Sequence, residues 1–323
     1  MFNALIEKLK AEPKTIVFTE GPDARILEAT ARLKAEGIMK VVLVGNVAEV
    51  EAKAKECGFD IEGVEIIDPE TYAEMDDMVA KMVELRKGKM TPEQCKANLV
   101  KGNYFGTMLV KMGKADCLLG GATYSTADTV RPALQLIKTK PGNSIVSSCF
   151  IMVRDNADGT QEKLCMGDCA INIHPTEDNL VEIAQETAKC AQTFGIDPKV
   201  AFLSFSTKGS AKDDEVTKVQ NAVAKAKEVM DVPVDGEMQF DAAVAPEVGQ
   251  LKFPGSQVAG HANTFIFPDV TAGNIGYKIA ARLGGFAAYG PILLGLNAPI
   301  NDLSRGCNAD EVYKMAIITA GLA

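Results

Sequence analysis

The segment 120–140 begins with a loop of small and hydroxyl-bearing residues, which has the composition of an anion-binding site. It follows a predicted buried strand and precedes a predicted helix, so main-chain N–H groups would lie at the positive end of the helix dipole. Arg131 adds a planar guanidinium that can hold phosphate through two hydrogen bonds. An ordinary helix start with Thr126 or Asp128 as N-cap explains the same pattern, so this loop alone leaves both interpretations open. The serine and threonine residues that precede Arg131 in this segment are Thr123, Ser125, Thr126 and Thr129.

Ser304 and Arg305 stand in a polar loop between the apolar segment 291–295 and the last apolar helix. The same loop contains Asn308, followed three residues later by Glu311, which is the pattern of a capping box. Capping gives a structural reason for Glu311, but it gives none for Ser304 and Arg305. These two residues are therefore candidates for chemistry, although a Ser-Arg pair is too short a motif to name a reaction.

Metal-binding patterns are weak in this sequence. Asp235, Glu237 and Asp241 are close together, but the spacing of carboxylates alone is poor support for a cation site. The chain has two histidines, which excludes a site built from several. The cysteine pair within 165–169 lacks a second Cys or His pair at zinc spacing. We therefore predict no metal site.

Short apolar segments alternate with long amphipathic ones along the chain. Buried strands that alternate with helices predict an α/β fold, with mainly parallel sheets that carry helices on both faces. The active sites of such sheets follow the carboxyl ends of the strands. The predicted strands are 15–20, 40–45, 64–68, 117–121, 144–153, 163–168, 199–206, 264–269 and 291–295, and the predicted helices are 3–10, 22–36, 47–57, 70–87, 91–112, 127–138, 177–194, 213–229, 273–283 and 308–321.

Two Gly- and Pro-containing breaks divide the chain into two predicted domains. The break near residue 140 is followed by two apolar runs joined by an Asp-Gly turn, which predicts an antiparallel hairpin and hence a mixed sheet. The second break lies within 290–302. We predict a first α/β domain from residues 1–143 plus 296–323, and a second from residues 144–295.

Composition narrows the class of protein. The 323 residues include 34 Lys and Arg against 43 Asp and Glu, a net charge of −9. Such acidity argues against a nucleic-acid partner. No apolar run reaches the roughly 20 residues that cross a bilayer, and the start lacks the apolar core of a signal peptide, so we expect no membrane contact and a cytoplasmic location. The eight cysteines lie mostly in apolar segments and are expected to be reduced.

These loops together resemble the phosphate acetyl/butyryltransferase family over essentially the whole chain. The resemblance is carried by long segments in matching order: TIVFTEGPDARILEATARLKAEGI (15–38), STADTVRPALQLIKTKPG (125–142), LSFSTKGSA (203–211), DGEMQFDAA (235–243), GNIGYKIAARLGG (273–285) and GPILLGLNAPINDLSRGC (290–307).

The resemblance implies reversible transfer of an acetyl group between acetyl phosphate and coenzyme A, which gives acetyl-CoA and inorganic phosphate. It implies a two-domain, three-layer α/β/α fold like that of isocitrate and isopropylmalate dehydrogenases, an active site in the cleft between the domains, and a homodimer. Coenzyme A would be a substrate, with no metal and no tightly bound cofactor.

The resemblance also implies roles for single residues. Ser304 and Arg305 match the family's catalytic pair, and Arg25 is a weaker match to a substrate-binding arginine. We assign substrate binding to the following residues as well: Arg86, Arg131, Arg282, Ser125, Thr126 and Asn301.

Four positions depart from the family pattern. The family usually has an aspartate seven residues after the serine, as the base for the coenzyme A thiol. Here that position is Glu311, with Asp310 beside it, so the base assignment stays open between them. Tyr124, Leu294 and His261 stand where the family commonly has His, Gln and Lys.

We expect direct attack of the thiol on the acetyl carbonyl in a ternary complex. Glu311 or Asp310 would accept the thiol proton, Arg305 would hold the phosphate, and Ser304 would donate a hydrogen bond to the developing negative charge. Other hypotheses are a phosphate butyryltransferase or another short-chain acyl transferase, a metal- and NAD-dependent decarboxylating dehydrogenase on the same fold, and a binding protein without activity.

Overall fold

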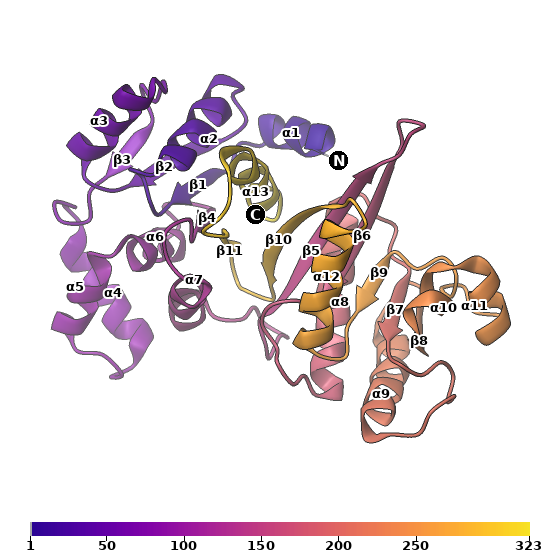
Figure 1. Ribbon diagram of the computed structural model, residues 1–323. Coiled ribbons are helices and arrows are strands. Elements are labelled where there is room, and N and C mark those ends of the chain that lie inside the picture. Colours follow the sequence, from indigo (N-terminus) through magenta and orange to yellow (C-terminus); the bar gives the residue numbers. More distant parts are fainter. Residues whose placement is uncertain (1) are drawn as a thin grey trace. The chain divides into compact units, whose positions relative to one another are not determined.

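The computed structural model describes residues 2–323, which form two compact units (Figure 1). The first unit combines Met1–Pro141 with Leu296–Ala323, and the second is Gly142–Gly295. Each unit is described by itself.

The first unit contains a five-stranded parallel sheet with the strand order β11-β4-β1-β2-β3. Its central strands are almost entirely apolar because helices cover both faces. The carboxyl ends of all five strands lie at one edge, where the functional loops begin. The strands are β1 (Thr15–Phe18), β2 (Lys40–Val44), β3 (Glu65–Ile67), β4 (Cys117–Gly120) and β11 (Ile300–Asp302).

Two groups of helices cover this sheet. Val17, Val42 and Leu118 pack with residues of α4, α5 and α6 in one core cluster. Helix α13 packs against α1, α2 and β4. The helices are α1 (Phe2–Ala11), α2 (Ala24–Ala35), α3 (Val47–Cys57), α4 (Met75–Arg86), α5 (Pro92–Leu99), α6 (Gly102–Lys111), α7 (Thr126–Pro132), the π-helix η1 (Ala133–Ile137) and α13 (Ala309–Gly321).

The predicted single helix 91–112 is in fact two helices, α5 and α6. Helix α6 begins at Gly102, which packs against the main chain just after β1. A Cβ at this position would collide with the Thr19 carbonyl oxygen. The packing of this glycine therefore ends one helix and starts the next, which the apolar periodicity does not reveal.

The second unit contains a six-stranded mixed sheet with the order β10-β5-β6-β9-β7-β8. Strand β5 runs antiparallel to β6 and β10, whereas β6, β9, β7 and β8 pair in parallel. The predicted α/β class with an antiparallel element is confirmed. The strands are β5 (Ser147–Asp155), β6 (Gln161–Gly167), β7 (Val200–Leu203), β8 (Val234–Met238), β9 (Thr264–Ile266) and β10 (Ala287–Leu294).

The helices of the second unit are α8 (Glu177–Thr193), α9 (Asp214–Val229), α10 (Phe240–Val244), α11 (Pro246–Lys252) and α12 (Val270–Arg282). Within residues 2–323, no helix is long and apolar enough to cross a membrane.

Candidate functional site

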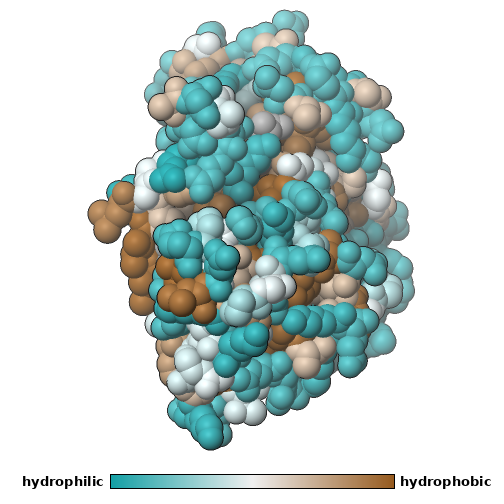
Figure 2. All heavy atoms as spheres, turned by 90° about the vertical axis from the view of Figure 1, so that its right-hand side faces the viewer, coloured by the Kyte–Doolittle hydropathy of each residue, from teal (hydrophilic) through white to brown (hydrophobic). Residues whose placement is uncertain are grey.

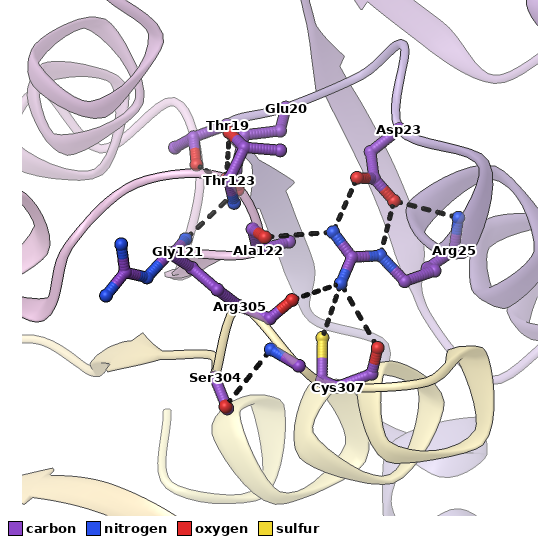
Figure 3. A network of polar contacts seen from close by, with 11 residues as sticks. Thr19, Glu20, Asp23, Arg25, Gly121, Ala122, Thr123, Ser304, Arg305 and Cys307 are labelled. Atoms are coloured by element: carbon purple, nitrogen blue, oxygen red, sulfur yellow. Dashed lines mark hydrogen bonds and ion pairs between the residues drawn. The ribbon is translucent and has the colours of Figure 1, made fainter.

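Three loops meet at the carboxyl edge of the first unit's sheet, because β1, β4 and β11 are neighbours there. The main-chain N–H of Leu303, just after β11, donates to the carbonyl of Gly120 at the end of β4, at 2.7 Å. The loop that carries Ser304 and Arg305 therefore leaves the sheet beside the loop that carries Gly121–Thr123 (Figure 3).

A buried carboxylate, Glu20, ties the first of these loops to the second. It accepts hydrogen bonds from the main-chain N–H of Gly121 at 3.0 Å and of Thr123 at 2.6 Å, and from the Thr123 hydroxyl at 2.9 Å (Figure 3). The Thr123 hydroxyl is thus engaged with the protein itself. Glu20 therefore fixes the loop after β4 at Gly121 and Thr123.

A second buried carboxylate, Asp302, fixes the start of α7. Its side-chain oxygens accept from the hydroxyl groups of Thr126, at 2.6 Å, and Thr129. Burial raises the pKa of Asp302, and the two hydroxyl donors oppose that rise. The N-cap of α7 is Ser125, so the alternative expectation of Thr126 or Asp128 as N-cap is wrong.

The predicted substrate-binding hydroxyls of Ser125 and Thr126 both point to carboxylates. Ser125 donates to Asp128 at 2.7 Å, and Thr126 donates to Asp302. A hydroxyl that donates in this way still has lone pairs but no proton to offer an anion. These two residues shape the loop, and their contact with a substrate stays a prediction.

Ser304 and Arg305 lie on an exposed turn just beyond β11. The Ser304 oxygen accepts from the main-chain N–H of Gly306 at 3.2 Å, and the Cys307 N–H donates to the Ser304 carbonyl at 2.9 Å. Among residues 2–323, no hydrogen bond or ion pair is found for the Arg305 guanidinium, which points away from the rest of the network (Figure 3). Its donors are available for a ligand.

Glu311 forms the predicted capping box at the start of α13. The Asn308 side chain accepts from the Glu311 N–H at 2.9 Å, and Glu311 Oε2 accepts from the Asn308 N–H at 3.1 Å. The other carboxylate oxygen, Oε1, has no partner within the described part of the chain. The side chain can thus cap the helix and accept a proton.

Asp310 forms ion pairs with two basic side chains. Its oxygens lie 2.7 Å from Lys314 Nζ and 3.2 Å from Arg32 Nη1. The hydrogen bond from Lys314, together with that from Arg32, holds the pKa of Asp310 below its usual value, although partial burial opposes this. Of the two predicted bases, Asp310 is therefore the poorer proton acceptor.

Arg86 and Arg131 both lie near Tyr104 of α6. The Tyr104 hydroxyl donates to the Gln135 side chain at 3.0 Å, and Arg86 Nη1 reaches the Gln135 carbonyl at 3.5 Å. Burial raises the pKa of Tyr104, while the positive charges of Arg131 and Arg86 lower it. Both arginines therefore lie close enough to influence one phenol.

The two guanidinium groups differ in what they already bind. Arg86 Nε is buried without a hydrogen-bond partner. Arg131 is half exposed and makes one ion pair, with Asp128 at 3.3 Å. Both groups thus keep unused donors, as an anion site requires.

Asn301 does not face a surface. Its side chain is fully buried, and its amide donates to the Thr319 hydroxyl at 2.9 Å. This bond joins β11 to α13, so the structure gives Asn301 a packing role where we predicted substrate contact. Tyr124 is half-buried: its hydroxyl hydrogen-bonds with that of Thr19 at 2.7 Å, and burial raises its pKa.

Arg282 ends α12 in the second unit, so its predicted role stays a prediction. The three carboxylates that suggested a cation site are each otherwise engaged: Asp235 with Lys227, Glu237 with Ser206 and the Gly209 N–H, and Asp241 with Lys252. Within residues 2–323 there is no group of three or more His, Cys, Asp or Glu side chains that could hold a metal ion.

Sequence reasoning missed the two buried carboxylates, Glu20 and Asp302. Each is a polar residue at or just after the end of a parallel strand, and this position in the sequence could have identified both as residues of the site. From the sequence, Arg25 is only a weak match to a substrate-binding arginine of the family. In the structure its side chain donates hydrogen bonds to Asp23 and to three main-chain carbonyls at this edge of the sheet (Figure 3).

A family model described as "Phosphate acetyl/butaryl transferase" matches residues 1–320. The chain belongs to this family. It is 54% identical over 324 residues to the phosphate acetyltransferase of Bacillus subtilis strain 168, covering 100% of this chain and 99% of that one. It is 50% identical over 328 residues to the phosphate acetyltransferase of Staphylococcus aureus strain Mu50, covering 100% and 98%. The resemblance seen in the sequence is confirmed.

Solved structures agree with this family assignment. A phosphotransacetylase from Streptococcus pyogenes superposes with a TM-score of 0.95 at 53% identity, covering 99% of this chain and 97% of that one. The EutD phosphotransacetylase from Staphylococcus aureus gives 0.92 at 50% identity, with the same coverage of 99% and 97%. A branched-chain phosphotransacylase from Enterococcus faecalis V583 shares the fold, at 19% identity and a TM-score of 0.68, covering 96% of this chain and 99% of that one.

Proposed function

We propose that this chain is a phosphate acetyltransferase, which transfers an acetyl group reversibly between acetyl phosphate and coenzyme A. The observation that carries the proposal is the Arg305 guanidinium, whose donors are unused on an exposed turn. The same segment leads into the first turn of α13, where Glu311 keeps one carboxylate oxygen without a partner among the described residues. A planar guanidinium binds a phosphoryl group through paired hydrogen bonds and neutralises its charge. The full-length relatives named phosphate acetyltransferase support the same reaction.

In the proposed reaction the thiol sulfur of coenzyme A attacks the carbonyl carbon of acetyl phosphate. The new S–C bond forms, the C–O bond to phosphate breaks, and the electron pair leaves with phosphate, which Arg305 stabilises. Glu311 accepts the thiol proton and passes it to the departing phosphate, so acetyl-CoA and inorganic phosphate are the products. Glu311 itself is returned unchanged.

In this proposal Ser304 stabilises the tetrahedral centre. Its oxygen already accepts a hydrogen bond from the Gly306 N–H, so its own proton is free to be donated. A preorganised donor aimed at developing negative charge is among the strongest single contributions to catalysis. Ser304 therefore acts as a hydrogen-bond donor in this proposal, with no acyl-enzyme intermediate.

Glu311 does not produce a stable thiolate. A free thiol has a pKa of about 8.5 and a glutamate carboxyl one of about 4.3, so complete transfer before attack is strongly unfavourable. Proton transfer must therefore accompany formation of the S–C bond, or nearby arginine charge must lower the pKa of the thiol.

Arg86 and Arg131 would bind the anionic groups of coenzyme A, because both keep free donors around Tyr104. Arg282 and the predicted cleft between the two domains stay predictions, as does the cytoplasmic location.

We also propose that the protein is a homodimer that uses one face of α12. Ile275, Ile279 and Leu283 are spaced four residues apart and are 54%, 54% and 85% exposed, whereas Gly273 is the only buried residue of this helix. Apolar side chains also gather at the left margin of the space-filling view (Figure 2). A contiguous apolar face of this kind suits the self-complementary interface of a two-fold dimer.

The proposed function is tested by acetyl-CoA formation from acetyl phosphate and coenzyme A with purified protein. Wild type should be active, and Arg305→Ala should lose at least about a hundredfold in kcat, as removal of one charge-stabilising group typically does. Lys140→Ala, which removes a cation outside this turn, serves as the control. An inactive wild type, or a fully active Arg305→Ala, would contradict the proposal. Acetyl phosphate in competition with butyryl phosphate decides the acyl preference.

A further inference from the structure

Arg25 lies in the first turn of α2. Its guanidinium group donates so many hydrogen bonds within the protein that it keeps no donor for a substrate. Its Nε donates to Asp23 Oδ1 at 2.9 Å. Its Nη2 donates to Asp23 Oδ2 at 2.7 Å and to the Ala122 carbonyl at 2.9 Å. Its Nη1 donates to the carbonyls of Arg305 at 2.9 Å and Cys307 at 3.1 Å (Figure 3). A guanidinium has five N–H donors, so all of them are used within the protein.

Asp23 orients this guanidinium. It is the N-cap of α2, and its Oδ1 also accepts from the Arg25 main-chain N–H at 2.9 Å. The resulting two-pronged pair fixes the plane of the guanidinium, as paired arginine–carboxylate contacts do. The remaining donors can then point only toward the loops after β4 and β11.

The contacts with Arg305 and Cys307 hold the catalytic turn by its backbone. The Arg305 carbonyl faces Arg25, whereas the Arg305 side chain leaves the turn in another direction (Figure 3). Because the peptide unit is planar, holding a carbonyl oxygen also holds the two Cα atoms of that peptide, which restrains the backbone that carries the side chains. The bond to the Ala122 carbonyl joins the same guanidinium to the loop after β4.

We propose that Arg25 is a positioning residue for the Ser304–Arg305 pair and that it does not bind substrate. This inference rests on the proposed function, because it assigns those two residues to catalysis. It replaces the substrate contact that the family resemblance suggested for Arg25. Misplacing a catalytic group by about 1 Å costs roughly a hundredfold in rate, so the contribution of this clamp should be visible in kcat.

The kinetic test compares Arg25→Ala and Arg25→Lys with wild type. We expect kcat to fall about a hundredfold while KM for coenzyme A changes less than about threefold, because other elements hold Arg86 and Arg131. Lysine should not rescue the activity, since an ammonium group lacks the planar fork that reaches several carbonyls at once. Lys34→Ala is the matched control: Lys34 lies on the same helix and pairs with Asp60 at 2.7 Å, away from the turn.

A second test does not depend on activity. Trypsin cleaves after arginine, and the Arg305 carbonyl that it attacks is the one that Arg25 holds. In Arg25→Ala, cleavage between Arg305 and Gly306, followed by mass spectrometry, should accelerate at least about tenfold relative to cleavage after Lys208, because local opening controls proteolysis. Measuring one site against another separates loosening of the turn from general unfolding.

Three results would overturn the inference: a folded Arg25→Ala protein with wild-type kcat, a variant in which only KM rises, or a turn cleaved at the wild-type relative rate. If wild type itself fails to form acetyl-CoA, the proposed function is wrong, whereas the trypsin assay still decides whether Arg25 holds the turn.

Discussion

Replacing Glu311 with glutamine should remove the proton acceptor and leave the helix intact. Glu311 caps α13 by accepting from the Asn308 N–H at 3.1 Å. A glutamine oxygen can accept the same bond, as Gln94 does from Thr91 at the start of α5, at 3.0 Å. The capping box is therefore kept, and we expect the free energy of unfolding to change by less than about 0.5 kcal/mol.

The effect on catalysis should be far larger. A positioned general base typically contributes about 10²–10⁴-fold, so Glu311→Gln should raise the activation barrier by about 2.7–5.5 kcal/mol. Asp310→Asn breaks only two partly exposed ion pairs, each worth about 0–1 kcal/mol, and should keep kcat within about threefold of wild type. Chemical denaturation measures the stability of each variant, and thioester formation followed by ultraviolet absorbance measures kcat.

The assignment of Glu311 fails if Glu311→Gln is fully active while Asp310→Asn is inactive, because the base would then be Asp310. If both variants are fully active, neither carboxylate accepts the thiol proton. A Glu311→Gln protein that loses activity together with stability would show that the loss is structural, and would refute the argument from the retained cap.

Three further predictions concern stability and assembly. Gly121 has a φ of +97°, and a Cβ at this position would collide with Asp302. Gly121→Ala should therefore lower the free energy of unfolding, measured by urea denaturation, by about 2–4 kcal/mol. A variant that unfolds at the same urea concentration as wild type would contradict this prediction. Because Lys314 lowers the folded-state pKa of Asp310, that carboxylate stabilises the fold above its unfolded pKa of about 3.9, and the gain is lost as pH falls through the lower folded value. Asp310→Asn should therefore lower Tm at pH 7 and have a smaller effect below about pH 3; equal shifts at both pH values would be inconsistent with the ion pairs. Finally, Ile279→Glu should convert the proposed dimer to monomer in sedimentation experiments, and an unchanged mass would exclude this face of α12 as the interface.

Local sequence patterns predicted the parts of the fold that depend on local chemistry. The capping box of Asn308 and Glu311 and the antiparallel hairpin with its Asp-Gly turn are confirmed. Two strands were missed, β8 (VDGEM) and β11 (IND). Both are short and carry polar residues that are buried in the folded chain, so neither has the apolar run by which the other strands were recognised.

The contacts of the candidate site could not be predicted because they join distant parts of the chain. Arg25 binds a carbonyl 280 positions away, and nothing in the residues around it indicates that partner. The same limit applies to Asn301, which we predicted to contact substrate, although its amide donates to Thr319 within the core. The family resemblance predicts the reacting residues, whereas the contacts that hold their loop are visible only in three dimensions.

The insertion of the second unit between Pro141 and Leu296 has a consequence for biosynthesis. A ribosome delivers the chain from the N-terminus, so β4 is made early but its neighbour β11 emerges only after the whole second unit. Until then, one edge of the first unit's sheet lacks its partner strand and is exposed to unwanted pairing. Ser304, Arg305 and Glu311 are all in this last segment, so a nascent chain lacks this constellation until both units have been synthesised.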